Sequence, residues 1–398
     1  MKRLATLFLL FIGTFLNAQN VTIPDANFKT ALIEEGVDTN GDGEIQLSEA
    51  EVVLDLGVGQ RNISSLEGIQ SFTSLINLSC SINQLVSLDL TQNLMLESLR
   101  CAANQLENLD VSENLFLKIL ICNSNELASL DVSLNLNLER LWVMNNELSS
   151  LDITQNTELE IVWCYTNQLT SLDVSQNSKL ERLWCSSNLL TDIDVSQNIS
   201  LETLACYGNL LTNLDVSQNL SLGGLACSNN QLSSLDLRQN INLEYLECQQ
   251  NLLHSLFLNN GNTGNISTMI SYENIDLTCI QVDDENANYP ECGGFPITGW
   301  CVDEWSFYND KCNLGLTNSE SNRITLYPNP VEDILSLSAP NTVILSAVIY
   351  AINGKEVGQF NSRSEGVTEI NISRLETGMY FLKLDLEDGQ ITKRIIKK

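Results

Sequence analysis

Histidine and basic residues are scarce in this sequence of 398 residues. It contains one histidine, His254, and 20 lysine and arginine residues against 50 aspartate and glutamate residues, so its formal net charge is −30. A single histidine excludes zinc sites built from several histidines and argues against a Ser-His-Asp catalytic arrangement. A strongly acidic surface repels nucleic acid and anionic lipid and attracts cations and basic partners. The composition therefore predicts no binding to nucleic acid.

Apolar runs long enough to cross a membrane are absent after the N-terminus. The first run, residues 4–16, follows the basic residues Lys2 and Arg3 and precedes the small residue Ala18. This order is typical of a secretory signal peptide, which we assign to residues 1–18. No later segment offers about 20 consecutive apolar residues, the length that a spanning helix needs. The sequence predicts export without a membrane span in the mature chain.

Phosphate-binding loops and dinucleotide-binding fingerprints are also absent. Paired carboxylates for glycoside hydrolysis are not excluded by counting, because 50 acidic residues are present. Repeating columns account for most of these residues, however, and a single active site would interrupt the repeat. We therefore predict that the protein is not an enzyme, with a glycan-degrading enzyme as the least favoured alternative.

What the sequence does contain is a tandem repeat of 21 residues. Asparagine and aspartate recur at the same interval as cysteine, from Asn83 to Asn251 and from Asp89 to Asp236, and Val143 fills the one gap in the cysteine series. A fixed period of this length is typical of a solenoid, in which each unit buries its apolar side by stacking on its neighbours. The cysteines in register are Cys80, Cys101, Cys122, Cys164, Cys185, Cys206, Cys227 and Cys248.

Each unit follows the pattern L-x-x-L-x-C-x-x-N-x-L-x-x-L-D-V-S-x-N-x-x. This pattern resembles the leucine-rich repeat over residues 54–258, with cysteine where a third leucine is usual. The resemblance implies a solenoid whose short strands form one long parallel β-sheet. Leu183 and Cys185 are expected to point inward, with Trp184 between them facing solvent. Asn188 and its equivalents are expected to bond neighbouring backbone at the turn, as such ladders do in this family.

The repeat cysteines could form disulfides, a metal site or a column of buried thiols. Side chains in register on adjacent strands lie about 4.8 Å apart, whereas a disulfide needs Cβ atoms about 3.8 Å apart. Val143 shows that the position accepts an aliphatic side chain. These observations favour buried free thiols.

The repeat aspartates, such as Asp194, could bind calcium as a stack or could bond local backbone. Each lies in a D-x-S/T/R-x-N turn, where aspartate and asparagine side chains commonly accept hydrogen bonds from nearby backbone. Turn chemistry accounts for these residues, so we favour the local role.

The position before each cysteine is predicted to face solvent, and it is tryptophan in three consecutive units. These rings could pack on one another as a cross-strand ladder, or form a docking surface for a partner, and the two interpretations are compatible. The expected partner is a basic protein surface or a glycan that stacks on the indole rings. The predicted binding residues are Trp142, Trp163, Trp184, Tyr165, Tyr207 and Tyr245. An acidic column beside them, interleaved with Arg140 and Arg182, comprises Glu139, Glu160, Glu181, Glu202 and Glu244.

Residues 38–49 carry oxygen-bearing side chains at regular intervals around a glycine, Gly43. The segment resembles an EF-hand calcium loop, and the resemblance implies a structural Ca²⁺ site in an N-terminal cap formed by residues 19–53, preceded by a helix from about Asp25 to Glu35. The alternative is an acidic turn without metal. The ligands implied by the resemblance are Asp38, Asn40, Asp42, Glu44, Gln46 and Glu49.

Four cysteines after the repeat lie out of register, in a segment that we expect to cap the solenoid, residues 259–318. In an exported chain such cysteines favour disulfides, and three connectivities are possible. We prefer nested pairs, Cys279 with Cys312 and Cys292 with Cys301.

The last segment, residues 321–398, lacks cysteine and is rich in short β-type runs, which predict a small β-sandwich. Its sequences LYPNP (326–330), L-x-x-GMYFLK (375–383) and ITKRIIKK (391–398) resemble the C-terminal sorting domain of the bacterial type IX secretion system. The resemblance implies contact with the secretion machinery, export to the outer cell surface, and anchoring or release after removal of this domain. The runs are 324–327, 334–337, 345–350, 368–372, 379–384 and 391–396, with a turn at Asn353 and Gly354.

Together these features predict a secreted or cell-surface leucine-rich repeat protein that binds a protein or glycan partner through the face of its solenoid. The competing prediction is a structural or adhesive spacer without a dedicated ligand.

Overall fold

The computed structural model describes residues 19–294, 297–312, 324–351, 355–386 and 389–398. The predicted signal peptide and the predicted turn at Asn353 and Gly354 lie outside the described residues. The chain divides after Asp310 into two compact units, which are described separately.

The N-terminal end of the first unit is a small helical cap. Helix α1 (Ala26–Glu34) begins at Asp25, whose Oδ1 accepts hydrogen bonds from the backbone N–H groups of Asn27 and Phe28 at 2.9 Å. The other carboxylate oxygen of Asp25 accepts from the N–H of Ser64 at 2.8 Å. A single aspartate therefore caps the helix and fixes it to the first coil. Helix α2 (Leu47–Ala50) follows the acidic loop. The predicted helix from about Asp25 to Glu35 is confirmed.

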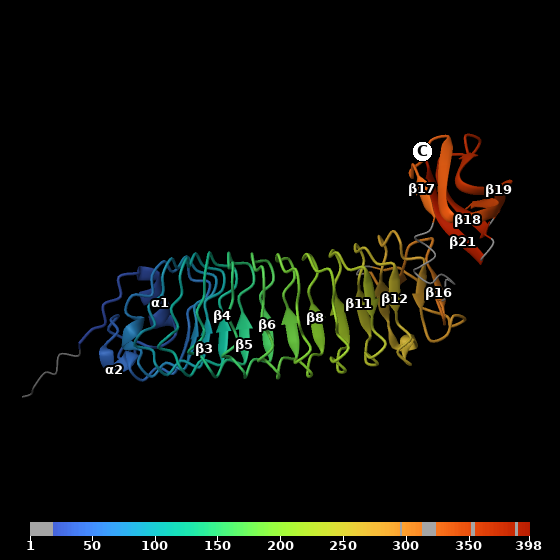
Figure 1. Cartoon of the computed structure of the whole chain (residues 1–398). Helices are drawn as coiled ribbons and strands as arrows, with labels where there is room; N and C mark the ends of the chain where they lie inside the picture. Colours follow the sequence, from blue (N-terminus) through green and yellow to red (C-terminus); the bar gives the residue numbers. More distant parts are fainter. Residues whose placement is uncertain (1–18, 295–296, 313–323, 352–354, 387–388) are drawn as a thin grey trace, which may run out of the picture. The chain divides into compact units, whose positions relative to one another are not determined.

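The body of the first unit is a leucine-rich repeat solenoid, as the sequence predicts. Its 12-stranded sheet is parallel throughout, and successive coils add neighbouring strands in sequence order (Figure 1). Each strand has three residues. The rest of each coil leaves the sheet and returns to it before the next strand begins. The strands are β1 (Asp55–Gly57), β2 (Asn77–Ser79), β3 (Ser98–Arg100), β4 (Ile119–Ile121), β5 (Arg140–Trp142), β6 (Ile161–Trp163), β7 (Arg182–Trp184), β8 (Thr203–Ala205), β9 (Gly224–Ala226), β11 (Tyr245–Glu247), β13 (Thr268–Ile270) and β15 (Gly299–Cys301).

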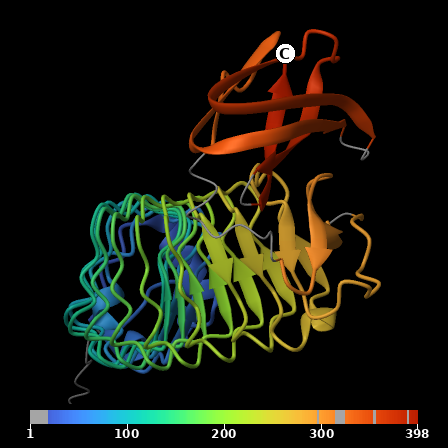
Figure 2. The same ribbon diagram turned by 45° about the vertical axis from the view of Figure 1, so that its right-hand side comes forward.

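A second parallel sheet forms on the later coils, in the order β10-β12-β14-β16. Figure 2 shows the same ribbon turned so that this end of the solenoid comes forward. Strand β13 pairs with β11, and β15 pairs with β13, so coiling continues beyond residue 258, where we placed the end of the repeat. The predicted cap is thus partly wrong: most of it consists of further, longer coils whose changed lengths hide the 21-residue period. The strands of the second sheet are β10 (Ser234–Asp236), β12 (Ser255–Phe257), β14 (Cys279–Gln281) and β16 (Phe307–Asn309).

The interior of the coils is filled by leucine columns and by the cysteine column. All eight repeat cysteines are buried and free, and Val143 occupies the same buried position in its coil. The prediction of buried thiols is confirmed. Burial raises the pKa of the thiols of Cys80, Cys122 and Cys185 to about 12.

Two asparagine columns tie each coil to its neighbours. Asn188 represents the first: its Oδ1 accepts from the N–H of Leu169 at 3.0 Å, and its Nδ2 donates to the carbonyls of Cys164 and Cys185 at 3.1 and 3.0 Å. This confirms the predicted role. The second column, represented by Asn198, was mistaken for part of a local turn. Asn198 is fully buried, and its Nδ2 donates to the carbonyls of Val174 and Asn177 in the preceding coil.

The second unit contains a five-stranded antiparallel sheet. Its strands are β17 (Thr325–Tyr327), β18 (Ile334–Ala351), β19 (Glu356–Asn371), β20 (Gly378–Leu386) and β21 (Gly389–Lys397). The first part of β18 pairs with β17 and the second part pairs with β20, while β19 follows β18 with three register shifts. Two predicted runs, 334–337 and 345–350, are therefore one long strand. Apolar residues from both parts of β18, including Leu337 and Ile349, belong to one buried cluster.

Candidate functional site

The three predicted tryptophans form one continuous stack on the long sheet. Strand register places Trp142 beside Trp163 and Trp163 beside Trp184. The ring centroids of the first pair are 4.1 Å apart with planes inclined by 13°, and those of the second pair are 4.6 Å apart with planes inclined by 11°. Both faces of Trp163 are therefore covered by neighbouring indoles. The cross-strand ladder that we considered is present.

The structure adds one predicted tyrosine to this stack and separates the other two from it. The ring of Tyr165 is tilted by 46° against Trp184, with 6.3 Å between centroids. Tyr207 and Tyr245 are exposed, and the described residues give neither of them an aromatic ring contact. The hydroxyl of Tyr245 donates to Glu247, and burial followed by this hydrogen bond raises the pKa of Tyr245. We use the name aromatic stack for Trp142, Trp163, Trp184 and Tyr165.

Small side chains follow the aromatic stack along the sheet. The position of Trp184 is taken by Ala205 on β8 and by Ala226 on β9. Strand β9 also carries Gly224, where an added Cβ would meet Thr203 at 3.6 Å, an ordinary contact. The backbone of β9 therefore does not require glycine. Where the stack ends, the sheet carries small side chains in place of large rings.

The indole nitrogens of the stack are buried donors without an acceptor in the part of the chain that the structure describes. The Nε1 atoms of Trp142, Trp163 and Trp184 are buried, and no hydrogen-bond partner is found for them among the described residues. A buried donor without an acceptor costs about 1 to 3 kcal/mol. The stack thus combines favourable ring contacts with three unsatisfied donors.

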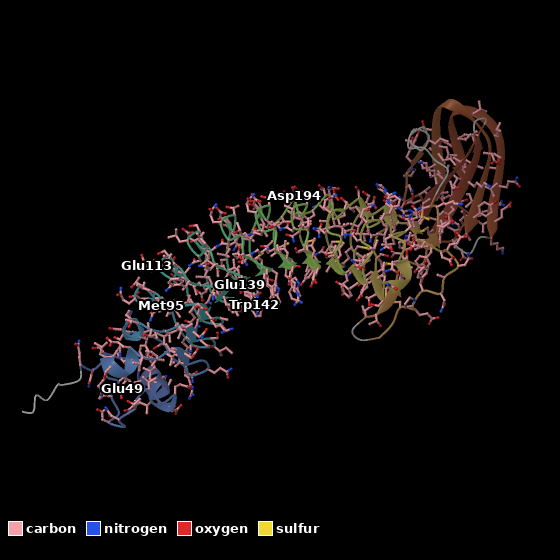
Figure 3. The ribbon with its side chains drawn as sticks, turned by 90° about the horizontal axis from the view of Figure 1, so that it is seen from below. Glu49, Met95, Glu113, Glu139, Trp142 and Asp194 are labelled. Carbon is pink, nitrogen blue, oxygen red and sulfur yellow. A yellow bond between two sulfur atoms is a disulfide. The ribbon has the colours of Figure 1, made fainter. Side chains whose placement is uncertain are left out.

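Carboxylates run beside the aromatic stack. Three members of the acidic column, Glu139, Glu160 and Glu181, each directly precede a strand that carries the stack, and Figure 3 labels Glu139 next to Trp142. Among the described residues, the ion pairs do not include this column, Arg140 or Arg182. Its charges are therefore available to a partner.

The repeat aspartates bond local backbone. The Oδ1 of Asp194 accepts from the N–H of Ser196 at 2.9 Å, and the same bond recurs in other coils. This hydrogen bond lowers the pKa of Asp194. The favoured local role of these aspartates agrees with this geometry.

The acidic loop is closed by its own hydrogen bonds. The carboxylate of Asp38 accepts from the N–H groups of Gly41 and Gly43 at 2.7 and 2.9 Å, and Asn40 Oδ1 accepts from Asp42 N–H at 2.8 Å. Gly41 and Gly43 have φ of 75° and 81°, which glycine adopts without strain. The turn at Gly43 therefore has the conformation that the resemblance requires.

Glu49 reaches back across the loop. Its Oε1 accepts from the N–H and the hydroxyl of Thr39 at 2.8 and 2.7 Å, and its Oε2 accepts from the N–H of Gln46 at 2.9 Å. Burial opposes ionisation of Glu49, but these donors outweigh it and lower its pKa. Asp42 accepts from Gln46 Nε2 at 3.0 Å. In the part of the chain that the structure describes, no three acidic, histidine or cysteine side chains form a ready metal cluster.

The later coils hold the disulfides and a second aromatic cluster. Cys292 is bonded to Cys301 as predicted, with 4.8 Å between Cα atoms, and Cys279 and Cys312 are also disulfide-bonded rather than free. Trp300 stacks on Tyr289 with 4.1 Å between centroids and meets the edge of Tyr308. Trp300 is 4% exposed and its Nε1 donates to the carbonyl of Ile266 at 2.8 Å. Sequence spacing did not reveal this cluster, because the coils that hold it differ in length.

In the second unit, the LYPNP segment is bonded to the end of the chain. Asn329 Oδ1 accepts from the N–H of Ile396 at 2.9 Å, and Asn329 Nδ2 donates to the carbonyl of Arg394 at 3.0 Å. Two of the motifs that carry the resemblance are therefore joined, by Asn329 and by the backbone hydrogen bonds of Val331 with Ile396 and Lys398.

Residues 325–398 match the family described as "Secretion system C-terminal sorting domain". The match indicates a type IX sorting domain. The protein is thus a secreted protein of the cell surface, and the sorting domain implies contact with the secretion machinery. No described helix is both long and apolar enough to cross a membrane. No curated protein matches the sequence.

Solved structures share the solenoid fold. An internalin, inlF, of Listeria monocytogenes is 20% identical with a TM-score of 0.53, covering 68% of this chain and 95% of that chain. The functional domain of InlJ from Listeria monocytogenes, described as including a cysteine ladder, is 21% identical with a TM-score of 0.44, covering 96% of this chain and 98% of that chain. A leucine-rich repeat protein of Leptospira interrogans is 22% identical with a TM-score of 0.47, covering 59% and 68%. At these identities the likeness concerns the fold alone.

Proposed function

We propose that this secreted leucine-rich repeat protein binds another protein through the sheet face that carries the aromatic stack. The observation that carries the proposal is the stack itself: three tryptophans aligned on adjacent strands at the surface, with an unpaired acidic column beside them. Tryptophan is enriched among the residues that dominate binding energy at protein interfaces. Tyr207, which follows β8, and Tyr245, on β11, are further exposed aromatic residues of the later coils.

The geometry favours a protein partner over a glycan. A sugar ring that stacks on indole needs a free ring face, but both faces of Trp163 are covered and Trp142 and Trp184 each have one face covered. Apart from the outer faces of Trp142 and Trp184, the stack presents ring edges. A protein partner can pack against edges, and its lysine or arginine side chains complement the acidic column.

The unsatisfied indole donors add support. Three buried N–H groups have no acceptor among the described residues, and Ile121, Ala205 and Ala226 in the coils before and after the stack show that the fold does not need tryptophan there. Unsatisfied groups in native structures call for an explanation, and a binding role provides one.

The experiment is a pull-down from bacterial and host surface extracts with the full chain, combined with a glycan array. We expect specific protein capture that the double variant Trp163→Ala, Trp184→Ala loses. A matched control, Leu189→Ser with Leu210→Ser, changes two exposed residues of neighbouring coils outside the sheet face and should retain capture.

Two outcomes would contradict the proposal. Capture that survives the tryptophan double variant would place the binding surface elsewhere, and binding to the glycan array alone would favour the glycan. If neither assay shows tryptophan-dependent binding, the solenoid acts as a surface spacer.

We also propose that the acidic loop binds Ca²⁺. The loop offers carboxylate, amide and carbonyl oxygens, the ligands that calcium prefers, from Asp38, Asn40, Asp42, Glu44, Gln46 and Glu49. Its glycines have the backbone conformation of the required turn, and Glu49 is already drawn toward residues 39 and 40. Bound calcium would hold the N-terminal cap in place.

Calorimetric titration of the full chain with CaCl₂ tests the loop. We expect binding heat that Asp38→Asn abolishes, because the neutral amide removes a charge while keeping an acceptor oxygen for the loop. Asp194→Asn is the control, since it probes the repeat aspartates by the same chemical change. Heat that persists in Asp38→Asn but disappears in Asp194→Asn would move the calcium to the aspartate column.

A further inference from the structure

Exposed apolar residues occupy the turn before the strand in three consecutive coils. In these turns the N–H groups of Leu96, Leu117 and Leu138 donate to the carbonyl of an asparagine three residues earlier, at 3.2, 3.1 and 3.1 Å. The two residues between donor and acceptor form the tip of each turn. Such tips usually carry glycine, proline, asparagine, aspartate or serine. Here the tips are Leu94 with Met95, Leu115 with Phe116, and Leu136 with Asn137.

The three turns lie side by side. Asn114 Nδ2 donates to the carbonyl of Asn93 at 2.9 Å, and Asn135 Nδ2 donates to the carbonyl of Asn114 at 2.9 Å. Each asparagine begins one of the turns, so the residues that follow lie one coil spacing apart, about 4.8 Å. Leu134 adds a further apolar side chain in the third coil. We name this set the edge patch: Leu94, Met95, Leu115, Phe116, Leu134 and Leu136.

The edge patch is large for an uncovered surface. Its six side chains are between 47% and 55% exposed. Together they present on the order of 500 Å² of apolar surface, in the upper part of the range for the largest patch on a monomer, where patches are often functional.

The turn itself does not require apolar residues. Thr157 with Glu158 and Ser178 with Lys179 fill the same tips in the next two coils, and these turns close with hydrogen bonds of 3.2 and 3.0 Å. Glu158 and Lys179 even form an ion pair between the coils at 2.5 Å. Because polar tips close with the same hydrogen bond, formation of the turn does not explain the edge patch.

Carboxylates precede the tips of the edge patch along the chain in each of the three coils. Glu113 lies in the turn of the second coil, close to Met95 toward the N-terminal end of the solenoid in Figure 3. Asp89, Asp110 and Asp131 are exposed and begin the same three turn regions, and no described ion pair neutralises these four residues. Two copies of this chain meeting at the patch would bring like charges together. A rim of this sign instead complements lysine and arginine.

We propose that the edge patch docks a polypeptide segment whose apolar side chains are flanked by lysine and arginine. This surface lies on a turn, apart from the aromatic stack, and the proposal does not depend on the function of the stack. The apolar centre supplies contact area, while the acidic rim selects partners of opposite charge and rejects a second copy.

The test uses the full chain and a fluorescent helical peptide with one leucine face and one lysine face. A peptide of the same length and charge with serine in place of leucine is the comparison. We expect fluorescence anisotropy to show binding of the leucine peptide that weakens with added salt, and much weaker binding of the serine peptide.

The decisive variant is Leu115→Ser with Phe116→Asn, which copies residues found at these tips in other coils. It should lower the affinity about tenfold or more, since two apolar contacts are lost, and leave the thermal unfolding midpoint unchanged. The control, Ile199→Ser with Leu220→Ser, places serine at the first tip position of two later coils outside the edge patch and should bind normally.

Several results would overturn the proposal. These are no binding of the leucine peptide, equal binding of the serine peptide, or equal loss in the control variant. Sedimentation equilibrium showing a dimer that Leu115→Ser with Phe116→Asn dissociates would assign the edge patch to a second copy.

Discussion

The cysteine column and the aspartate column repeat at the same interval, yet the fold gives them opposite environments. Cys185 is fully buried and Asp194 is exposed, although they are nine residues apart in one coil. Burial raises the pKa of the Cys185 thiol to about 12, while a backbone N–H from Ser196 lowers the pKa of Asp194. At neutral pH the cysteines are neutral thiols and the aspartates are charged carboxylates. Each column favours the fold in that protonation state.

The difference shows how a repeat multiplies a local effect. A single buried thiol matters little to the pH dependence of a protein, but eight thiols in equivalent positions respond together. The exposed aspartates are equally numerous, yet solvent screens each of them. The predicted effect of pH on stability is therefore larger for the cysteine column than for the aspartate column, and it has the opposite sign.

Alkaline pH should produce the largest effect. The folded-state pKa of the cysteines lies above the ordinary value of 9.0, so their contribution is complete below pH 9 and declines as the unfolded chain loses protons above it. Above pH 9 each buried thiol disfavours the folded state as the unfolded chain ionises, and eight such thiols act in the same direction. Tryptophan fluorescence during an alkaline titration should report unfolding of the solenoid.

A variant with Cys164, Cys185 and Cys206 replaced by valine separates this effect from titration of tyrosine and lysine. Val143 shows that the position accepts valine. The variant should unfold at higher pH than the wild-type chain. An unchanged midpoint would mean that the thiols do not drive alkaline unfolding.

Removal of one asparagine from each column should have intermediate effects. Asn188→Ala leaves the buried N–H of Leu169 without its acceptor, and we expect a loss of about 3 kcal/mol. Asn198→Ala should cost about 1 to 2 kcal/mol, because the carbonyls of Val174 and Asn177 keep backbone N–H donors. It also removes a buried Oδ1 that has no partner among the described residues. Urea denaturation followed by tryptophan fluorescence measures both.

The order of these two variants is the informative result. Equal losses would show that hydrogen bonds to the carbonyls, which the two columns share, dominate their contribution. A larger loss for Asn198→Ala would show that filling the interior matters more than satisfying the N–H of Leu169.

Replacement of a surface aspartate should have the smallest effect. Because the folded-state pKa of Asp194 lies below the ordinary 3.8, its contribution is present above that value and is lost as pH falls through the lowered pKa. Asp194→Asn should therefore lower the thermal midpoint slightly at pH 7 and not at all in strong acid. A midpoint shift at pH 7 as large as that of Asn188→Ala would contradict the small role assigned to exposed turns.

Sequence reasoning located most of the fold because the repeat supplies its own register. Once cysteine positions are aligned, Trp142, Trp163 and Trp184 must fall on adjacent strands, and the structure confirms this pairing. The prediction was weaker where the period changes. Strands β13 and β15 continue the sheet after intervals longer than 21 residues, so pattern matching ended the solenoid too early.

Environment was harder to predict than register. Asn188 and Asn198 are the same residue type in the same repeat. Among the described residues, the Oδ1 of Asn188 accepts a hydrogen bond, whereas the Oδ1 of Asn198 has no partner. Likewise, the sequence did not distinguish Leu94, at an exposed turn tip, from Leu96, which is fully buried two residues later. Burial depends on which way the chain turns, and that direction is set by bonds between coils.

The sequence by itself determined the repeat, its inward and outward positions, the buried thiols and the sorting domain, because each follows from a pattern within the chain. Only the tertiary structure decided that the indoles cover one another's faces, that the second asparagine column lies in the interior, and that apolar turn tips gather into the edge patch. These features depend on contacts between coils. Spacing along the chain specifies which residues become neighbours, but packing specifies which of their surfaces remain open.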